Sequence, residues 1–219
     1  MLLEKAKEYA QDCISGKEIT TFEVKTQCKW FLEDLEKQNN DYYPYYFDTK
    51  QIEIIEGILK LLNFATGLNI VGKSIYEGLE NFQAFFIANI FGWRYKSDSR
   101  KFRYREVDLF IPRKNSKTFL AALIIIILML TEDEYSEFYS ICLDRDLAGE
   151  VKKAISQILN ASPLVSEYFN IPKTLSGRME CILTHSFYQP RTAEANRNNS
   201  IRPSAFIADE YGAMKDNAN

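Results

Sequence analysis

The sequence Ile111-Pro112-Arg113-Lys114-Asn115-Ser116-Lys117-Thr118 comes directly before an apolar run, FLAALIIIILML, at 119–130. We predict a strand over Phe102–Ile111, because FRYREVDLFI is β-rich and half alternating, and a helix that begins at Lys117. A loop between a strand and a helix presents successive backbone N–H groups and a helix N-terminus to an anion. We therefore interpret residues 112–118 as a phosphate-binding loop.

The residue types in this loop suit nucleotide phosphates. The Lys117 side chain can reach the β- and γ-phosphates, and the Thr118 hydroxyl can ligate Mg²⁺. The match to the general GxxxxGK[ST] pattern is poor, because Ile111 and Ser116 stand where glycines are expected. If the position of Ser116 needs a positive φ, serine costs more there than glycine, so we expect slower hydrolysis or weaker binding. The alternative interpretation is a basic surface turn before a core helix.

The apolar run has 12 residues, and a membrane-spanning helix needs about 18–20. The helix after a phosphate loop is commonly enclosed in the core, so it can be apolar on all sides. A buried helix is therefore the better explanation. The N-terminal sequence MLLEK has charged residues where a signal peptide needs an uninterrupted apolar stretch.

A second motif lies near the end of the chain, where Ser204–Ala208 is predicted to be a short apolar strand that leads into Asp209 and Glu210. In phosphate-loop ATPases, an aspartate at such a strand end helps to hold Mg²⁺, and the following glutamate can polarise the attacking water. Taken alone, the two acids could equally be solvated loop charges. Their combination with the upstream loop favours a nucleotide site.

The rest of the chain indicates an α/β fold. Residues 1 to about 65 have the spacing of amphipathic helices, interrupted at Asn39–Pro44, and a helix is predicted over Leu79–Phe91. Further predictions are strands over Glu137–Leu143 and Met179–Phe187 and a helix over Asp144–Leu159. Alternation of strands and helices implies a mostly parallel sheet flanked by helices. We expect an N-terminal helical arm at 1–70 and a phosphate-loop core at 71–219.

A net charge of −3 over 219 residues does not indicate a nucleic-acid binder, so any DNA role must rest on local charge or on a partner. One local stretch is basic: Phe91–Thr118 holds nine Lys and Arg against three acids, a net of +6. It could line a subunit interface or face DNA. The four cysteines lack metal-type spacing and are interpreted as reduced thiols, and the lone His185, in a predicted strand, is interpreted as structural.

The ordered set of motifs resembles one family, the large terminase subunit of tailed bacteriophages, in the group with a PRKNGK[ST]-type phosphate loop. The loop is similar at Pro112–Thr118, and the strand Ile207-Ala208-Asp209-Glu210-Tyr211 is similar to an IIDE-type strand. Upstream, the resemblance is carried by Leu79-Glu80-Asn81-Phe82-Gln83-Ala84-Phe85, by Ile90-Phe91-Gly92-Trp93 and by Arg100-Lys101-Phe102-Arg103. It covers nearly the whole chain, although residues 1–75 match in character more than in motif.

The resemblance implies an ATP hydrolase with a P-loop NTPase-like fold and Mg²⁺ as its metal. Arg113, Lys114, Asn115, Ser116, Lys117 and Thr118 would bind ATP, and Thr118 and Asp209 would hold Mg²⁺. Glu210 would be the catalytic carboxylate. Arg113 resembles a loop arginine that senses the γ-phosphate, and Gln83 resembles a glutamine that reads adenine. The alternatives are general electrostatic support for Arg113 and Lys114 and a packing role for Gln83.

The same resemblance implies a motor that packages double-stranded DNA in the cytoplasm of a bacterial host. A portal protein, a small terminase subunit and a homo-oligomeric ring are its implied partners, and no membrane is involved. Family members continue into further ATPase strands and a nuclease domain, so a chain ending at Asn219 is expected to be a fragment with most of the ATPase domain. In ring motors a neighbour's arginine often completes the site; the candidates are Arg100, Arg103, Arg145 and Arg191.

The sequence is also compatible with two other functions. A helicase-like nucleic-acid translocase shares the upstream glutamine and the Asp-Glu strand. A non-catalytic nucleotide-binding or assembly module is suggested by Ser116 and by the early end of the chain.

Overall fold

The computed structural model describes residues 1–142, 145–174, 177–192 and 202–209, without the side chains of 145–148. Its backbone divides into two compact units. The first unit contains residues 1–60 and 74–110, and the second contains residues 61–73 and 111–219. The boundaries of these units differ from the boundary predicted at residue 70 between an N-terminal arm and a phosphate-loop core. The division into arm and core stays a prediction.

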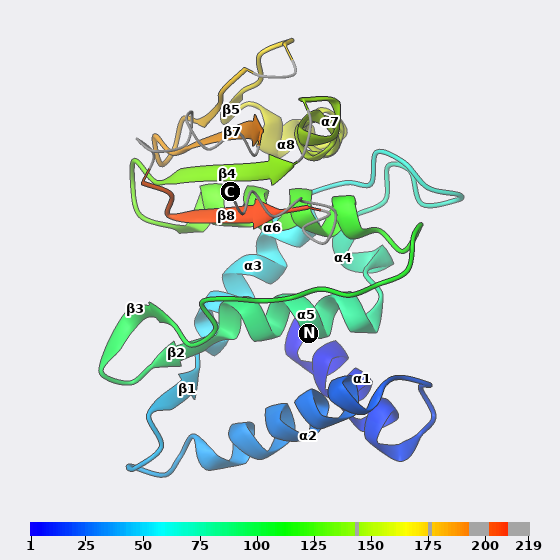
Figure 1. Cartoon of the computed structure of the whole chain (residues 1–219), viewed down its shortest axis with the longest axis vertical. Coiled ribbons are helices and arrows are strands. Elements are labelled where there is room, and N and C mark those ends of the chain that lie inside the picture. The colour runs from blue at the N-terminus through cyan, green and yellow to red at the C-terminus, as the bar shows by residue number, and fades with distance from the viewer. Residues whose placement is uncertain (143–144, 175–176, 193–201, 210–219) are drawn as a thin grey trace, which may run out of the picture. The chain divides into compact units, whose positions relative to one another are not determined.

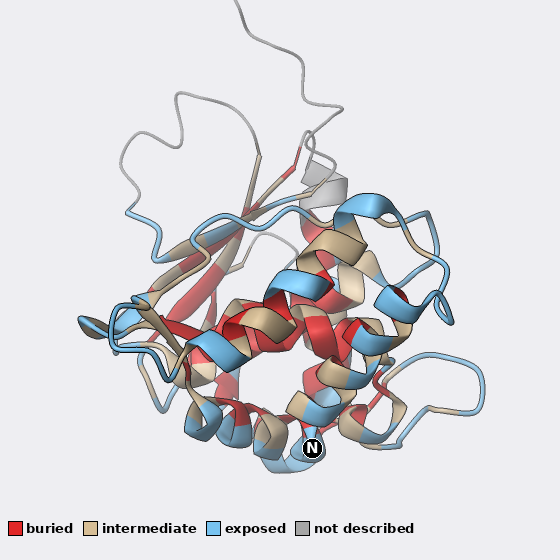
Figure 2. Ribbon diagram, turned by 90° about the horizontal axis from the view of Figure 1, so that it is seen from below, coloured by how far each residue is buried: buried red, intermediate tan, exposed pale blue. Residues whose placement is uncertain are grey.

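The first unit is mainly helical. Its helices are α1 (Leu2–Ser15), α2 (Phe22–Lys37), α3 (Thr49–Leu61), α4 (Ile75–Gly78) and α5 (Asn81–Gly92). The end of α1 and the start of α2 are set by local features. Gly16 ends α1 with a φ of 84°, and the Thr21 hydroxyl caps the start of α2 by accepting a hydrogen bond from Val24 N. The helices carry buried and exposed residues on opposite sides (Figure 2). This confirms the helices predicted over residues 1–65 and 79–91.

The core of the first unit is aromatic and surrounds α5. The Phe31 ring meets the rings of Phe85 and Trp93 edge-on at centroid distances of 5.3 and 6.3 Å. Gly92 ends α5 against the Phe47 ring, where an added Cβ would lie 2.3 Å from a ring carbon. Only glycine allows this close approach, so the end of α5 is fixed by packing as much as by helix propensity.

A small antiparallel sheet completes the first unit. Its strands are β1 (Tyr45–Phe47), β2 (Trp93–Tyr95) and β3 (Asp98–Phe102), in the order β1-β2-β3. The prediction of a strand over Phe102–Ile111 is wrong, because β3 ends at Phe102 and residues 103–116 form no strand. Charged side chains at 105, 106 and 108 are exposed, and Phe110 is 93% exposed. This segment has the composition of a strand but pairs with no strand among the described residues.

The second unit is built on a five-stranded sheet (Figure 1). Its strands are β4 (Glu137–Cys142), β5 (Phe169–Asn170), β6 (Met179–Cys181), β7 (Phe187–Thr192) and β8 (Ala205–Ala208), in the order β5-β6-β7-β4-β8. β4 pairs in parallel with both β7 and β8, whereas β5 and β6 are antiparallel additions at one edge. The α/β class with a parallel central sheet is confirmed.

The helices of the second unit are α6 (Lys117–Thr131), α7 (Arg145–Asn160) and α8 (Pro163–Ser166). α6 and α7 pack against each other, and α7 packs on β4 and β7. α6 is buried along nearly its whole length, as predicted for the apolar run. Within the described residues, no helix has the length and apolar character needed to cross a membrane.

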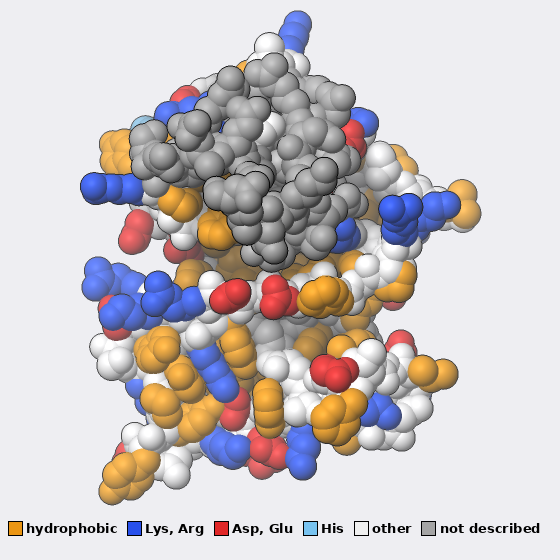
Figure 3. Space-filling view, in the orientation of Figure 1, with side chains coloured by type: hydrophobic (Ala, Val, Ile, Leu, Met, Phe, Trp, Pro, Cys, Tyr) orange, Lys and Arg blue, Asp and Glu red, His pale blue; other side chains and the backbone are white. Residues whose placement is uncertain are grey.

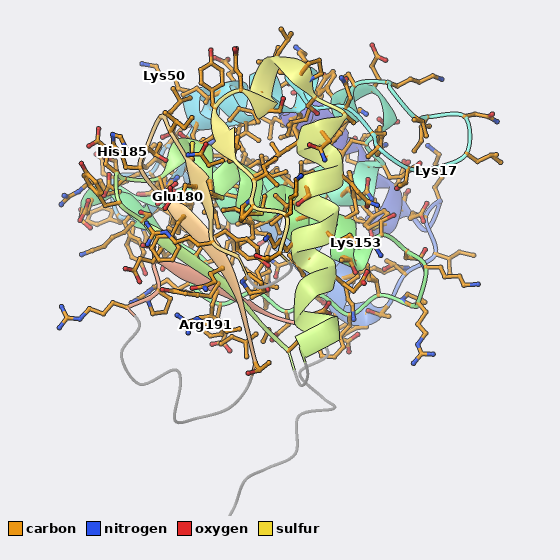
Figure 4. The ribbon with its side chains drawn as sticks, turned by 90° about the horizontal axis from the view of Figure 1, so that it is seen from above. Lys17, Lys50, Lys153, Glu180, His185 and Arg191 are labelled. Carbon is orange, nitrogen blue, oxygen red and sulfur yellow. The ribbon has the colours of Figure 1, made fainter. Side chains whose placement is uncertain are left out.

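The prediction of one strand over Met179–Phe187 is wrong, because this stretch contains β6, a turn and the first residue of β7. His185, labelled in Figure 4, lies in this turn with φ 52° and stacks on Tyr135 at 5.3 Å. The hydroxyl groups of Thr184 and Ser186 donate to the Met129 carbonyl at the end of α6. The turn is therefore fixed by a contact about 55 residues away in the sequence, which a local apolar pattern does not reveal.

Candidate functional site

The segment 112–116 forms an exposed turn that leads into α6. Lys114 and Ser116 both adopt the left-handed region, with φ 68° and 65°. The Asn115 amide donates to the carbonyls of Pro112 and Arg113, each at 3.3 Å, and so closes the turn on itself. The position of Ser116 does need a positive φ, and an L-residue pays about 1–2 kcal/mol for that conformation.

α6 begins immediately after this turn. The Ser116 carbonyl accepts the first helical hydrogen bond, from Leu120 N at 2.9 Å, so the preceding N–H groups belong to the open first turn of the helix. The aligned peptide dipoles of a 15-residue helix place partial positive charge at this end. The loop therefore combines a helix N-terminus with the cationic side chains of Arg113, Lys114 and Lys117, a combination that attracts anions.

The loop that was predicted to bind phosphate and the acidic strand end meet in the second unit. Lys117 Nζ lies 2.9 Å from Asp209 Oδ1, with side chains that are 39% and 14% exposed, respectively. Asp209 is positioned by the sheet: its N–H donates to the Ile141 carbonyl at 3.1 Å, which continues the parallel pairing of β8 with β4. Two motifs that are far apart in the sequence thus form one ion pair. Glu210 lies outside the described residues.

Gln83 takes part in a structural contact of the first unit. Its side-chain oxygen accepts from Glu80 N at 3.0 Å and forms a capping box at the start of α5, and the residue is only 5% exposed. This contact gives the glutamine a structural role at the N-terminus of α5 that is independent of any nucleotide.

Some of the cations in the basic stretch before the loop are held in contacts within the first unit. Arg94 is buried with its guanidinium 3.5 Å from the Phe102 ring centroid, and Arg103 forms an ion pair with Asp34 at 2.6 Å. Arg100 and Lys101 extend from the β2–β3 hairpin and share Asp98. Lys and Arg side chains gather over this hairpin in the space-filling view (Figure 3).

The four arginines that were candidates for completing a neighbouring subunit's site differ in exposure and contacts. Arg103 is held inside the first unit by Asp34 and by the Tyr43 hydroxyl, at 2.9 Å, so it is poorly placed to reach a neighbouring subunit. The Arg100 side chain is 81% exposed. Arg191 lies over the Tyr139 ring at 5.5 Å, and the side chain of Arg145 is outside the described residues.

The structure also shows a cavity that sequence patterns did not predict. It has a volume of about 290 Å³ and lies within the second unit, where it is lined by the first turn of α6, by residues of α7 between 150 and 158 and by the segment 64–66. Thr118 and Phe119 line it, directly after Lys117. The only sequence feature that could have indicated it is the pair Phe64 and Phe119, whose rings stack at 5.3 Å across 55 residues of chain.

Comparisons with known proteins give a family and a similar fold. Residues 81–219 match the family model described as terminase large subunit, ATPase domain. The fold is similar to that of the HK97 bacteriophage large terminase in its crystal structure, with a TM-score of 0.60 and 19% identity. The match covers 78% of this chain and 32% of that protein, so this chain spans about a third of its length. No curated protein sequence matches the chain significantly.

The family match covers more than half of the chain and includes the phosphate loop, the apolar helix and the acidic strand end. The similarity to the solved structure shows that the two proteins share a fold. Membership implies a nucleotide-binding domain of the ATPase type. The chain therefore belongs to the family of terminase large subunit ATPase domains.

Proposed function

We propose that this chain hydrolyses ATP with Mg²⁺ and that the hydrolysis drives double-stranded DNA into a procapsid. The observation that supports this most strongly is the 2.9 Å ion pair between Lys117 and Asp209. It brings the cation of the phosphate loop to the carboxylate at the end of β8. A phosphate group with its metal needs both of these charges within a few ångströms.

In this proposal the loop residues Arg113, Lys114, Asn115, Ser116, Lys117 and Thr118 bind the phosphates of ATP. The donor set fits a magnesium ion, because a hydroxyl and a carboxylate are oxygen ligands of the kind that Mg²⁺ prefers. Thr118 would hold the ion directly and Asp209 through water. When bound, Mg²⁺ neutralises charge on the phosphate oxygens. Glu210 would orient and polarise the attacking water.

Two further roles are proposed, one for a residue of the loop and one for a residue of the first unit. Arg113 is exposed in the loop, where its planar guanidinium can contact the γ-phosphate through two hydrogen bonds. Gln83 would read adenine with its amide, which can both donate and accept. The capping box of α5 uses one of these groups, the side-chain oxygen, so the adenine role competes with a structural one.

The proposed partners follow from a packaging motor: double-stranded DNA, a portal protein, a small terminase subunit and further copies of the chain in a ring. Work in the cytoplasm of a bacterial host is part of the same proposal. The exposed cations of the β2–β3 hairpin, Arg100 and Lys101, are a suitable surface for an anionic partner, although both share the charge of Asp98.

A second candidate function is a nucleotide-binding module without turnover. The observation that favours it is the φ of 65° at Ser116, because a strained serine in the loop can displace the N–H groups that bind phosphate. A helicase-like translocase would use the same ion pair.

Steady-state ATP hydrolysis with Mg²⁺ tests the main proposal. Lys117→Ala is expected to lower kcat by about 100-fold or more, because one preorganised charge is removed from the developing transition state. Glu210→Gln is expected to keep ATP binding but to lose turnover. Lys173→Ala, which changes an exposed lysine elsewhere in the second unit, is the matched control and should behave as wild type.

The outcomes separate the candidates. Full hydrolysis in Lys117→Ala would contradict the loop assignment, and full hydrolysis in Glu210→Gln would remove that residue from catalysis. ATP binding without turnover in the wild-type chain would favour the nucleotide-binding module.

A further inference from the structure

We propose that the β2–β3 hairpin of one copy of the chain docks on a second copy, at the surface formed by the turn after α6 and the turn between β6 and β7. This inference rests on the proposed ring and adds to it the two surfaces through which neighbouring copies meet. The hairpin is basic, whereas the surface of the two turns is acidic and partly apolar. Because the two surfaces differ, each copy can offer one of each to a further neighbour, which is the arrangement that builds rings or open chains.

The hairpin presents cations to solvent (Figure 3). The side chains of Arg100 and Lys101 are 81% and 70% exposed, and both pair with Asp98, at 3.3 and 3.6 Å. Together with the exposed Lys96, three cations against one acid leave a net of +2 on residues 95–101. A DNA duplex carries a phosphate charge about every 1.7 Å along its axis and is bound through many cations. A small surface with a net of +2 is better matched by a few carboxylates of a protein.

The turn after α6 has the opposite charge. Glu132, Asp133 and Glu134 follow one another directly, and α6 has no basic residue in its last turn. A helix C-terminus already carries partial negative charge, so acids there are unfavourable within one copy. Asp133 and Glu134 are exposed, and neither forms an ion pair with a residue that the structure describes. Cations from outside the copy would relieve this repulsion.

An apolar surface lies beside these acids. The Tyr135 N–H donates to the Thr184 carbonyl at 2.9 Å, and the Tyr135 ring stacks on that of His185, which is labelled in Figure 4. Tyr135 is 70% exposed, and Ile182 and Leu183, in the turn between β6 and β7, are 47% and 55% exposed. Exposed apolar side chains that gather in this way mark protein interfaces more often than nucleic-acid sites. Tyrosine and arginine are also the residue types that contribute most at such interfaces.

The apolar surface is held in a fixed conformation. Tyr135 and His185 both have a positive φ, 64° and 52°, which L side chains adopt only at a cost. The hydroxyl groups of Thr184 and Ser186 hold the turn on the Met129 carbonyl. A surface that is rigid before docking loses little conformational entropy when a partner binds. A guanidinium such as that of Arg100 can lie over the exposed Tyr135 ring while the neighbouring carboxylates pair with its charge.

Self-association of the full chain, measured by sedimentation velocity at low and high salt without nucleotide, tests this inference. The wild type should associate, and more weakly at high salt, because salt screens the charges. Arg100→Glu combined with Lys101→Glu should lower the association constant by about tenfold or more, and so should Asp133→Lys combined with Glu134→Lys. An equimolar mixture of these two double variants should associate again, because a reversed hairpin then meets a reversed turn.

Two further variants separate docking from general charge and from folding. Lys29→Glu combined with Lys50→Glu makes the same change of charge at exposed positions of α2 and α3, and it should associate as wild type does. Tyr135→Asn removes the ring, and asparagine adopts a positive φ with less strain. This variant should unfold in urea at the wild-type midpoint or above it and yet associate about three- to tenfold more weakly.

A wild-type chain that stays monomeric at low salt would overturn the inference, and so would a mixture of the two double variants that does not associate. Loss of duplex DNA binding in the hairpin variant, with unchanged association, would assign the hairpin to DNA and would also overturn it. ATP binding and hydrolysis are measured separately. A chain that associates as expected but does not bind ATP would overturn the proposed function and not this interface.

Discussion

Lys117 Nζ and Asp209 Oδ1 lie 2.9 Å apart, so the first residue of α6 and the first residue after β8 form an ion pair. The pair is half-buried, and each partner is positioned by a regular element: Lys117 by the helix that starts there, and Asp209 by its backbone bond to Ile141 on β4. In the proposed mechanism a phosphate takes the place of the carboxylate at Lys117. Binding of nucleotide therefore has to break this pair.

Replacement of Ser116 by glycine should relieve strain in the loop. The φ of 65° costs serine about 1–2 kcal/mol. Glycine avoids this cost but loses more conformational entropy on folding, which offsets about half of it, so we expect a gain of about 0.5–1 kcal/mol in the free energy of unfolding. ATP affinity or turnover should rise as well. Asn69→Gly, at φ 61° in the segment 61–73, is the control and should leave nucleotide affinity unchanged. Unaltered stability and activity in Ser116→Gly would show that the loop is not strained.

Two substitutions at Gln83 separate its structural role from adenine binding. Gln83→Ala removes the acceptor for Glu80 N and should cost about 1 kcal/mol of stability. Gln83→Glu keeps an acceptor oxygen for the capping box but has no amide N–H to donate. If the residue reads adenine, Gln83→Glu should remain as stable as wild type in urea unfolding and yet bind ATP about three- to tenfold more weakly. Wild-type ATP affinity in Gln83→Glu would contradict adenine binding by Gln83 and would leave capping of α5 as its role.

The ion pair of Asp34 with Arg103 should be important for the stability of the first unit. Both side chains are mostly buried, at 8% and 18% exposed, so Asp34→Ala leaves an arginine cation with little solvent. We expect a loss of about 3 kcal/mol or more in the free energy of unfolding, measured with urea. Glu33→Ala, which removes a partly exposed acid of the same helix and its surface ion pair with Lys37, should cost less than about 1 kcal/mol. Equal losses in the two variants would contradict the buried-pair account.

Tyr139 should make stability depend on pH in the alkaline range. Burial raises the pKa of Tyr139 from 10.0 to about 12, with help from the hydrogen bond that its hydroxyl donates to Glu137 at 2.8 Å. Because the folded pKa is the higher one, this stabilisation is complete below pH 10 and is lost as pH rises through 12. The stability difference between wild type and Tyr139→Phe should therefore shrink above pH 10. The exposed Tyr42→Phe should show no such trend, and a constant difference for Tyr139→Phe would refute the shift.

The features that were predictable from sequence are those that depend on near neighbours. The apolar run after Lys117 predicted α6, and the strand–helix alternation predicted β4, α7 and β8 with boundaries close to those observed. The order of the motifs predicted that Lys117 and Asp209 belong to one site, but the direct ion pair between them was not predicted. Ser116 stands where the general loop pattern has a glycine, which raised the question of a positive φ, and the structure answers it with a φ of 65°.

The features that sequence did not reveal depend on distant contacts. β1 forms only because Tyr45–Phe47 meets β2 nearly fifty residues later, and the turn at Thr184 is held by the Met129 carbonyl. Residues 103–111 are the opposite case: the sequence pattern is typical of a strand, but among the described residues the segment has no partner strand and is irregular. The cavity beside Thr118 joins three separate segments, so no single stretch of sequence indicates it.

The central claim is that residues 112–118 and Asp209 form one site for ATP and Mg²⁺, and the most direct test is ATP affinity with and without Mg²⁺. We expect Asp209→Asn to lose the gain in affinity that Mg²⁺ gives, while its metal-free affinity is equal to or above that of wild type because Lys117 is released from its partner. Lys117→Ala should bind weakly in both conditions. Wild-type affinity in Lys117→Ala, or an intact Mg²⁺ effect in Asp209→Asn, would contradict the account.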